Sequence, residues 1–144
     1  MSFTRADIPD LHGRIAVVTG ANGGLGLETA AALAAKGATV LMAVRDQAKA
    51  QSAVDRIRAE TADADLELVP LDLGALTSVR SAADQILGAH DRVDILVNNA
   101  GVMATPERST ADGFEMQLGI NHLGHWALTA HLMPLLVAAP AVRC

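Results

Sequence analysis

A glycine-rich turn directly after an unbroken apolar run constrains this chain more than any other feature. Residues 15–18 (IAVV) form a run typical of a strand covered on both faces of a sheet. Residues 19–26 (TGANGGLG) follow, and then Leu25, Thr29 and Leu33 recur every four residues among alanines, as in a helix. Glycine suits a sharp reversal, a close phosphate and tight packing of a helix on a sheet. The turn therefore predicts a site for a phosphate-bearing ligand.

The rest of the chain continues the alternation of strands and helices. Apolar runs predict further strands at 39–44, 66–71 and 93–97, with Pro70 favouring an edge position for the third. The predicted helices cover 25–36, a stretch after Asp46, 76 to Gly88, and Asp112 to about Ala139, and 102–111 is the longest loop. We expect an α/β fold of Rossmann type: a doubly wound parallel sheet of strand order 3-2-1-4, in one domain over residues 1–144.

Composition excludes several classes of protein. Apolar residues make up 51% of the chain, which suffices for a core, and the net charge of −5 argues against nucleic-acid binding. The single Cys144 fits a reducing cytoplasm, and no apolar stretch reaches the roughly 20 residues of a membrane span. His122 and His125 lie three apart, but no Glu or Cys completes a zinc site, so we expect no metal and assign them to a helix face or to packing. Trp126 is assigned to packing and not to substrate stacking.

Four motifs occur in a fixed order along the chain. The glycine turn has the spacing T-G-x-x-x-G-x-G, Asp72-Leu73 follows the third strand, Asn98-Asn99-Ala100-Gly101 follows the fourth, and Asn121 lies within the last helix. With these motifs the chain resembles the short-chain dehydrogenase/reductase family over essentially its whole length. Residues 101–125 resemble the retinol-dehydrogenase-like members of that family.

The resemblance implies hydride transfer between a nicotinamide cofactor and an alcohol or carbonyl substrate. It assigns Asn121 to the catalytic site. It assigns the following residues to cofactor binding: Gly20, Asn22, Gly24, Leu25, Gly26, Arg45, Asp72, Leu73, Asn98, Ala100 and Gly101. Asp72 could alternatively cap the following helix, and Asn98 could be a turn residue at the end of a strand.

The end of the second strand bears on which nicotinamide cofactor is bound. An acid at the strand tip binds the free ribose hydroxyl of NAD, whereas a basic residue pairs with the 2′-phosphate of NADP. Asp46, 20 residues after Gly26, by itself favours NAD. The strand register instead places Val44 at the tip and Asp46 at a helix N-cap, which leaves Arg45 for the phosphate. We expect NADP, with NAD as the alternative and a solvated surface arginine as the other interpretation of Arg45.

Most of the family's catalytic residues are missing from the sequence. The family uses a serine after a fifth strand and a Tyr-x-x-x-Lys pair, but this chain has no tyrosine, and its two lysines, Lys36 and Lys49, lie in its first half. We expect the N-terminal, cofactor-binding half of the fold, ending before the fifth strand and inactive by itself. A truncated reading frame is favoured over a stand-alone nucleotide-binding or interaction module, and over a chain completed by a partner.

The predicted fourth strand also bears on assembly. With no fifth strand its free edge would be a template for another chain, protected only by Asp94. Phe114, Leu118, Leu128 and Leu132 of the last helix would lose cover. We therefore expect a homo-oligomer or self-association through this edge.

Overall fold

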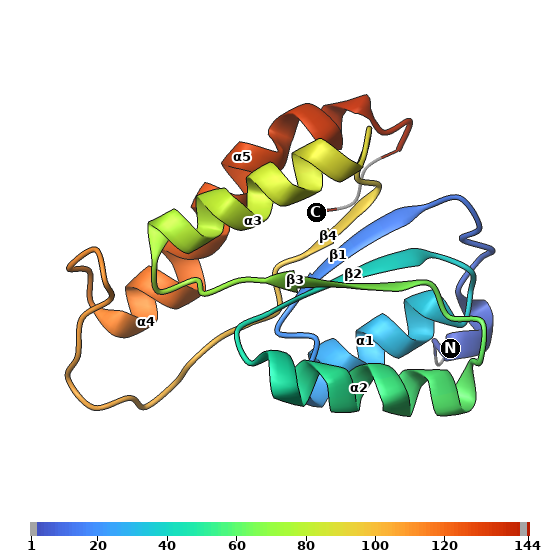
Figure 1. Cartoon of the computed structure of the whole chain (residues 1–144), viewed down its shortest axis with the longest axis horizontal. Coiled ribbons are helices and arrows are strands. Elements are labelled where there is room, and N and C mark those ends of the chain that lie inside the picture. Colours follow the sequence, from blue (N-terminus) through green and yellow to red (C-terminus); the bar gives the residue numbers. More distant parts are fainter. Residues whose placement is uncertain (1–2, 142–143) are drawn as a thin grey trace.

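The computed structural model describes residues 3–141 and residue 144. Its four strands form one parallel sheet in the order β3-β2-β1-β4 (Figure 1). The strands are β1 (Ile15–Thr19), β2 (Thr39–Val44), β3 (Leu66–Pro70) and β4 (Ile95–Val97). The Rossmann-type sheet and the strand order expected from the sequence are therefore confirmed, and Pro70 lies on an edge strand as predicted.

Helices cover both faces of the sheet (Figure 1). On one face α1 (Gly24–Ala34) and α2 (Gln47–Glu60) bury residues against Val18, Val40 and Met42. On the other, α3 (Leu76–Ala89) and α5 (His125–Ala138) pack against Val17, Leu41 and Val69. A 3₁₀ turn (Arg5–Asp7), the short α4 (Met116–Leu118) and a π-helical segment (Gly119–Gly124) complete the described elements. None of the helices in the described part is long and apolar enough to cross a bilayer.

The junction of β2 and α2 has the predicted register. Val44 is the last residue of β2, and the Asp46 carboxylate accepts hydrogen bonds from the backbone N–H groups of Ala48 and Lys49, each at 3.1 Å. These bonds satisfy two of the donors that a helix N-terminus leaves unpaired. Asp46 is therefore the N-cap of α2, as the sequence predicts.

The start of the last helical region and the end of α3 differ from the prediction. The helix begins at Met116, because the Glu115 carboxylate caps it through the N–H groups of Gln117 and Leu118, at 2.9 and 2.8 Å. Asp112 instead accepts a hydrogen bond from the Leu76 N–H at 2.8 Å and ties the loop to α3. Gly88 lies inside α3 and does not end it.

Burial of the apolar side chains in the last helical region agrees only in part with the expectation. Leu128 and Leu132 are fully buried in the core beside α3, so the prediction that they lose cover is wrong. Phe114 and Leu118 are 40% and 50% exposed. Trp126 is 68% exposed, so its assignment to packing is also wrong. The sequence shows that apolar residues recur along this helical region, but it does not show which of them face a neighbouring helix.

Asp94 links β1 to β4 where the two strands begin, and it does not shield the free edge of β4. Its side chain is buried and accepts hydrogen bonds from the Ile15 N–H at 3.0 Å, Arg14 at 2.7 Å and Arg92 at 3.2 Å. Burial raises the pKa of this carboxyl, but these donors outweigh it and hold the pKa below its ordinary value. Asp94 thus joins the beginnings of β1 and β4.

We predict that Asp94→Asn lowers the free energy of unfolding at pH 7 by about 1.5–3 kcal/mol, the range for a hydrogen bond to a charged group. The amide is neutral and accepts through a single oxygen, so the two arginines and the Ile15 N–H compete for it. Urea denaturation measures the change. Asp84→Asn is the control, because Asp84 is exposed and lies 3.9 Å from its partner Arg80. Equal stabilities of the two variants would contradict the prediction.

Candidate cofactor-binding site

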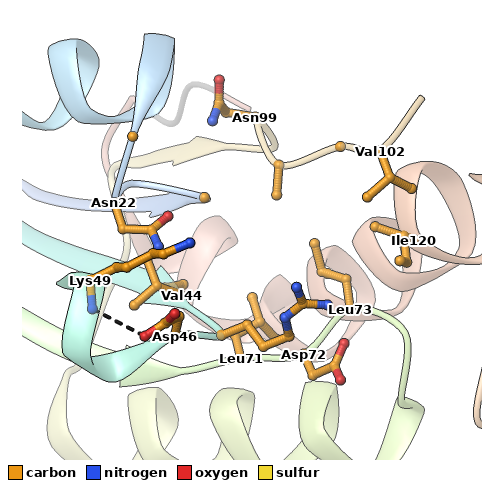
Figure 2. A pocket seen from close by; sticks show the side chains of 16 residues that line it. Asn22, Val44, Asp46, Lys49, Leu71, Asp72, Leu73, Asn99, Val102 and Ile120 are labelled. Carbon is orange, nitrogen blue, oxygen red and sulfur yellow. Dashed lines mark hydrogen bonds between the residues drawn. The ribbon is translucent and has the colours of Figure 1, made fainter. Parts of the chain in front are cut away.

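A cavity of about 430 Å³ lies at the carboxyl ends of the four strands (Figure 2). This is where open α/β sheets bind their ligands. Its wall comes from the end of β2, the loops after all four strands, the start of α2 and one residue of the π-helical segment. The lining residues are Gly20, Asn22, Gly23, Ala43, Val44, Arg45, Asp46, Lys49, Leu71, Asp72, Leu73, Asn99, Ala100, Gly101, Val102 and Ile120.

The glycine turn has the geometry that its spacing predicts. Gly20 and Gly24 have φ angles of +64° and +52°, which residues with a side chain rarely adopt. A Cβ on Gly26 would lie 2.3 Å from the Gly20 carbonyl oxygen and 2.5 Å from Nδ2 of Asn99. Gly26 therefore permits the close packing of α1 against the turn.

Thr19 joins the loops that follow β1 and β4. Its buried Oγ1 accepts hydrogen bonds from the backbone N–H groups of Asn99 and Ala100, both at 2.9 Å. The side-chain amide of Asn99 also donates a hydrogen bond to the Thr19 backbone carbonyl, at 2.9 Å. These bonds hold two walls of the cavity together without using any charge.

Asn99, and not Asn98, faces the glycine turn. The exposed Asn98 donates to Oγ1 of Thr129 at 3.3 Å and lies outside the cavity lining. Sequence reasoning chose Asn98 because both asparagines belong to one motif. The alternation of side chains after a strand could have separated them, since neighbouring residues point to opposite sides.

Two cations lie on the wall near the tip of β2. Arg45 lines the cavity. Lys49, in the first turn of α2, lines it too (Figure 2). Sequence reasoning missed Lys49, although its position three residues after the cap Asp46 places it on the first turn of the helix. Asp46 shares this wall, and its carboxylate already accepts the two backbone hydrogen bonds of the cap.

Asp72 and Leu73 form another part of the wall (Figure 2). The Asp72 carboxylate accepts a hydrogen bond from the Gly74 N–H at 2.8 Å, and its own N–H donates to the Ser78 hydroxyl at 2.9 Å. Asp72 thus shapes the turn before α3 and lines the cavity, but it does not cap the helix, because the N-cap of α3 is Ala75.

The structure places Gly20, Asn22, Ala100 and Gly101 on the lining with Arg45, Asp72 and Leu73. Three other predicted residues, Gly24, Leu25 and Gly26, form the first turn of α1 beside it, and Leu25 is 80% exposed.

Asn121 lies in the π-helical segment, is exposed, and is outside the cavity lining. Its side-chain oxygen accepts from the Val102 N–H and its amide donates to the Val102 carbonyl, each at 2.8 Å. Asn121 therefore fixes the position of Val102, which lines the cavity.

His125 connects Asn121 to Thr19. Its Nδ1 lies 3.1 Å from the Asn121 carbonyl oxygen and its Nε2 2.9 Å from Oγ1 of Thr19. Burial lowers the pKa of this imidazole below its ordinary value, although the hydrogen bond to Asn121 opposes the shift. His122, on the same helical stretch, is exposed. In residues 3–141 and 144, no three His, Cys, Asp or Glu side chains gather as a metal site would require.

Known proteins share both the sequence pattern and the fold that build this cavity. The family model described as short chain dehydrogenase matches residues 14–142. The chain belongs to the short-chain dehydrogenase family. The prediction from the glycine spacing and the later motifs is thereby confirmed.

Individual relatives agree with this assignment. The chain is 49% identical over 139 residues to a short chain dehydrogenase/reductase, dpchH, of Colletotrichum higginsianum, covering 94% of this chain and 35% of that protein. It is 46% identical to human retinol dehydrogenase 13, covering 97% and 41%. The Pseudomonas aeruginosa RhlG/NADP active-site complex superposes with a TM-score of 0.77 at 33% identity, covering 92% and 52%. The chain thus spans less than half the length of these two curated short-chain dehydrogenase relatives.

We predict that Gly26→Ala destabilises the short-chain dehydrogenase fold by about 1–3 kcal/mol, the usual cost of overpacking. The added methyl group would overlap the Gly20 carbonyl and force α1 away from the turn. Thermal unfolding measures the effect. Gly88→Ala is the matched control, because a Cβ there meets nothing within 4 Å and alanine favours a helix interior by about 0.5–1 kcal/mol. If Gly26→Ala melts at or above the wild-type temperature, the packing argument fails.

Proposed function

We propose that this chain is the NADP(H)-binding half of an oxidoreductase that transfers hydride between the nicotinamide and an alcohol or carbonyl substrate. The observation that carries the proposal is the presence of Arg45 and Lys49 on one wall of the cavity, beside the tip of β2. A basic pair at this position suits the 2′-phosphate that distinguishes NADP from NAD.

The residues at the strand tip favour NADP over NAD. Binding of the free 2′-hydroxyl of NAD is favoured by an acid at the tip, but the chain has the apolar Val44 there. The carboxylate of Asp46 is engaged by the N–H groups that it caps. The similar RhlG structure is a complex with NADP, which supports the same choice.

The glycine turn fits the pyrophosphate of such a cofactor. Gly20, Asn22 and Gly23 line the cavity and lead into the N-terminus of α1. The partial positive charge and unpaired N–H groups of a helix N-terminus favour a phosphate. Asp72 and Leu73 lie on the part of the wall that the family resemblance assigns to the adenine. Bound NADP(H) supplies the hydride chemistry, and the residues of this chain hold and orient the cofactor.

The chain by itself is proposed to bind the cofactor without turnover. The sequence contains no tyrosine, so it lacks the family's general acid, and Asn121 is the family's catalytic residue that it retains.

We also propose that the chain is cytoplasmic and that it self-associates through β4. β4 pairs with β1 through Ile95–Val97, and no strand of the described residues pairs with its other side.

We predict that the purified chain binds NADPH more tightly than NADH, and that Arg45→Ala and Lys49→Ala each weaken NADPH binding by about 1–3 kcal/mol. Neither variant changes NADH binding appreciably, because NADH lacks the 2′-phosphate. Isothermal titration calorimetry at fixed ionic strength measures both cofactors.

Arg58→Ala is the matched control, since Arg58 is an exposed cation farther along α2. It removes the same charge from the same helix and should leave NADPH binding unchanged. Equal losses for NADPH and NADH in the Arg45 variant would contradict its role at the 2′-phosphate.

We also predict that the purified 144-residue chain reduces no ketone or aldehyde above background in the presence of NADPH. General acid–base catalysis supplies about 10²–10⁴-fold, and its tyrosine donor is missing. Loss of NADPH absorbance over a panel of carbonyl compounds measures turnover. Turnover by the chain alone would overturn the proposed lack of activity, while failure to bind NADPH would overturn the proposed function itself.

A further inference from the structure

A buried histidine outside the cavity lining links the end of β1 to the segment that carries Asn121. His125 is 6% exposed and reaches Thr19 through Nε2 and the Asn121 carbonyl through Nδ1. Thr19 holds the backbone of Asn99 and Ala100, and Asn121 holds the backbone of Val102. Asn99, Ala100 and Val102 all line the cavity and all belong to the loop after β4, so the two ring nitrogens of His125 lead to different residues of that loop.

The hydrogen bonds determine which nitrogen carries the proton. A carbonyl oxygen can only accept, so the bond to Asn121 requires a hydrogen on Nδ1. In a neutral ring Nε2 then has none and must accept, which makes Thr19 the donor. The two lone pairs of the Thr19 hydroxyl remain for the N–H groups of Asn99 and Ala100. Every donor and acceptor of this network has a partner with the Nδ1–H form.

A charged ring would disturb the same network. Protonated Nε2 would point a hydrogen at Oγ1 of Thr19, which already accepts two hydrogen bonds. The Thr19 hydroxyl would have to turn toward the Val97 carbonyl, at 3.3 Å. The charge would also be buried, and neither neighbouring partner is an anion.

We propose that neutral His125, in the Nδ1–H form, is a positioning residue that holds the loop after β4 in register with the segment carrying Asn121. Its role in cofactor binding rests on the proposed function, but the tautomer and the coupling between Thr19 and the segment carrying Asn121 do not. If His125 merely filled space in the core, an isosteric apolar residue would serve as well and the tautomer would have no consequence.

The wild-type chain tests the first part of the proposal. Long-range ¹H–¹⁵N spectra of the histidine rings at pH 7 distinguish a protonated from a bare ring nitrogen. We expect His125 to show a protonated Nδ1 and a bare Nε2. A protonated Nε2, in either the other tautomer or the imidazolium, would overturn the proposal whether or not any variant folds.

Two substitutions separate the two hydrogen bonds. The amide of His125→Asn can occupy the place of Nδ1 and keep the bond to Asn121, whereas His125→Gln can reach the place of Nε2 and keep the bond to Thr19. We expect the Asn variant to shift the backbone amide signals of Asn99 and Ala100, and the Gln variant to shift that of Val102. His125→Leu, which keeps neither bond, should shift all three.

Cofactor affinity provides the second measurement. We expect His125→Leu to weaken NADPH binding about three- to tenfold, the effect of losing about one hydrogen bond, and the Asn and Gln variants to recover part of the loss. Val79→Ala is the control, because Val79 is buried in α3 and lies outside the cavity lining. It lowers stability and should leave affinity unchanged.

The outcomes separate this proposal from the proposed function. If the wild-type chain does not bind NADPH, the proposed function fails, and the tautomer and the amide shifts alone decide the role of His125. If NADPH binds but the Leu variant loses no more affinity than Val79→Ala, His125 is a packing residue and the positioning proposal is wrong. The positioning proposal is also wrong if the Asn and Gln variants shift identical signals.

Discussion

The absence of a side chain at Gly26 is the constraint on which the cavity depends. With no Cβ there, the first turn of α1 lies against the Gly20 carbonyl and the Asn99 amide. That contact brings the loops after β1 and β4 together, and the buried Thr19 hydroxyl then joins them through two backbone N–H groups. At the opposite end of the same two strands, the Asp94 carboxylate accepts a hydrogen bond from the Ile15 N–H and so joins β4 to β1. β1 and β4 are therefore joined at both ends by buried polar groups, and the cavity opens where the chain reverses.

Much of the fold could be predicted because its signals are local. Apolar runs such as 39–44 marked the strands, and Asp46 marked the start of α2, since a cap depends on residues two and three positions away. The π-helical segment and the start at Met116 could not be predicted in this way, because a π turn has no comparable local pattern. The burial of Leu128 was missed as well, because it depends on the packing of α5 beside α3, which are distant in sequence.

The site was predictable where its residues follow directly from strand ends. Gly20, Arg45 and Ala100 could be assigned from the motif and the register, and all three line the cavity. Asn99 and Lys49 were missed, because the choice between neighbouring asparagines depends on side-chain direction and the place of Lys49 on the wall depends on how α2 docks. Sequence reasoning likewise could not find the network of His125, which joins residues 106 positions apart.

A crystal structure of the chain grown with NADP⁺ tests the central claim most directly. The account predicts density for the pyrophosphate against the Gly20 turn and the N-terminus of α1, with the 2′-phosphate within hydrogen-bond distance of Arg45 or Lys49. Asn121 should remain bonded to Val102. Density for the nucleotide outside this cavity, or a 2′-phosphate directed away from both cations, would contradict the account.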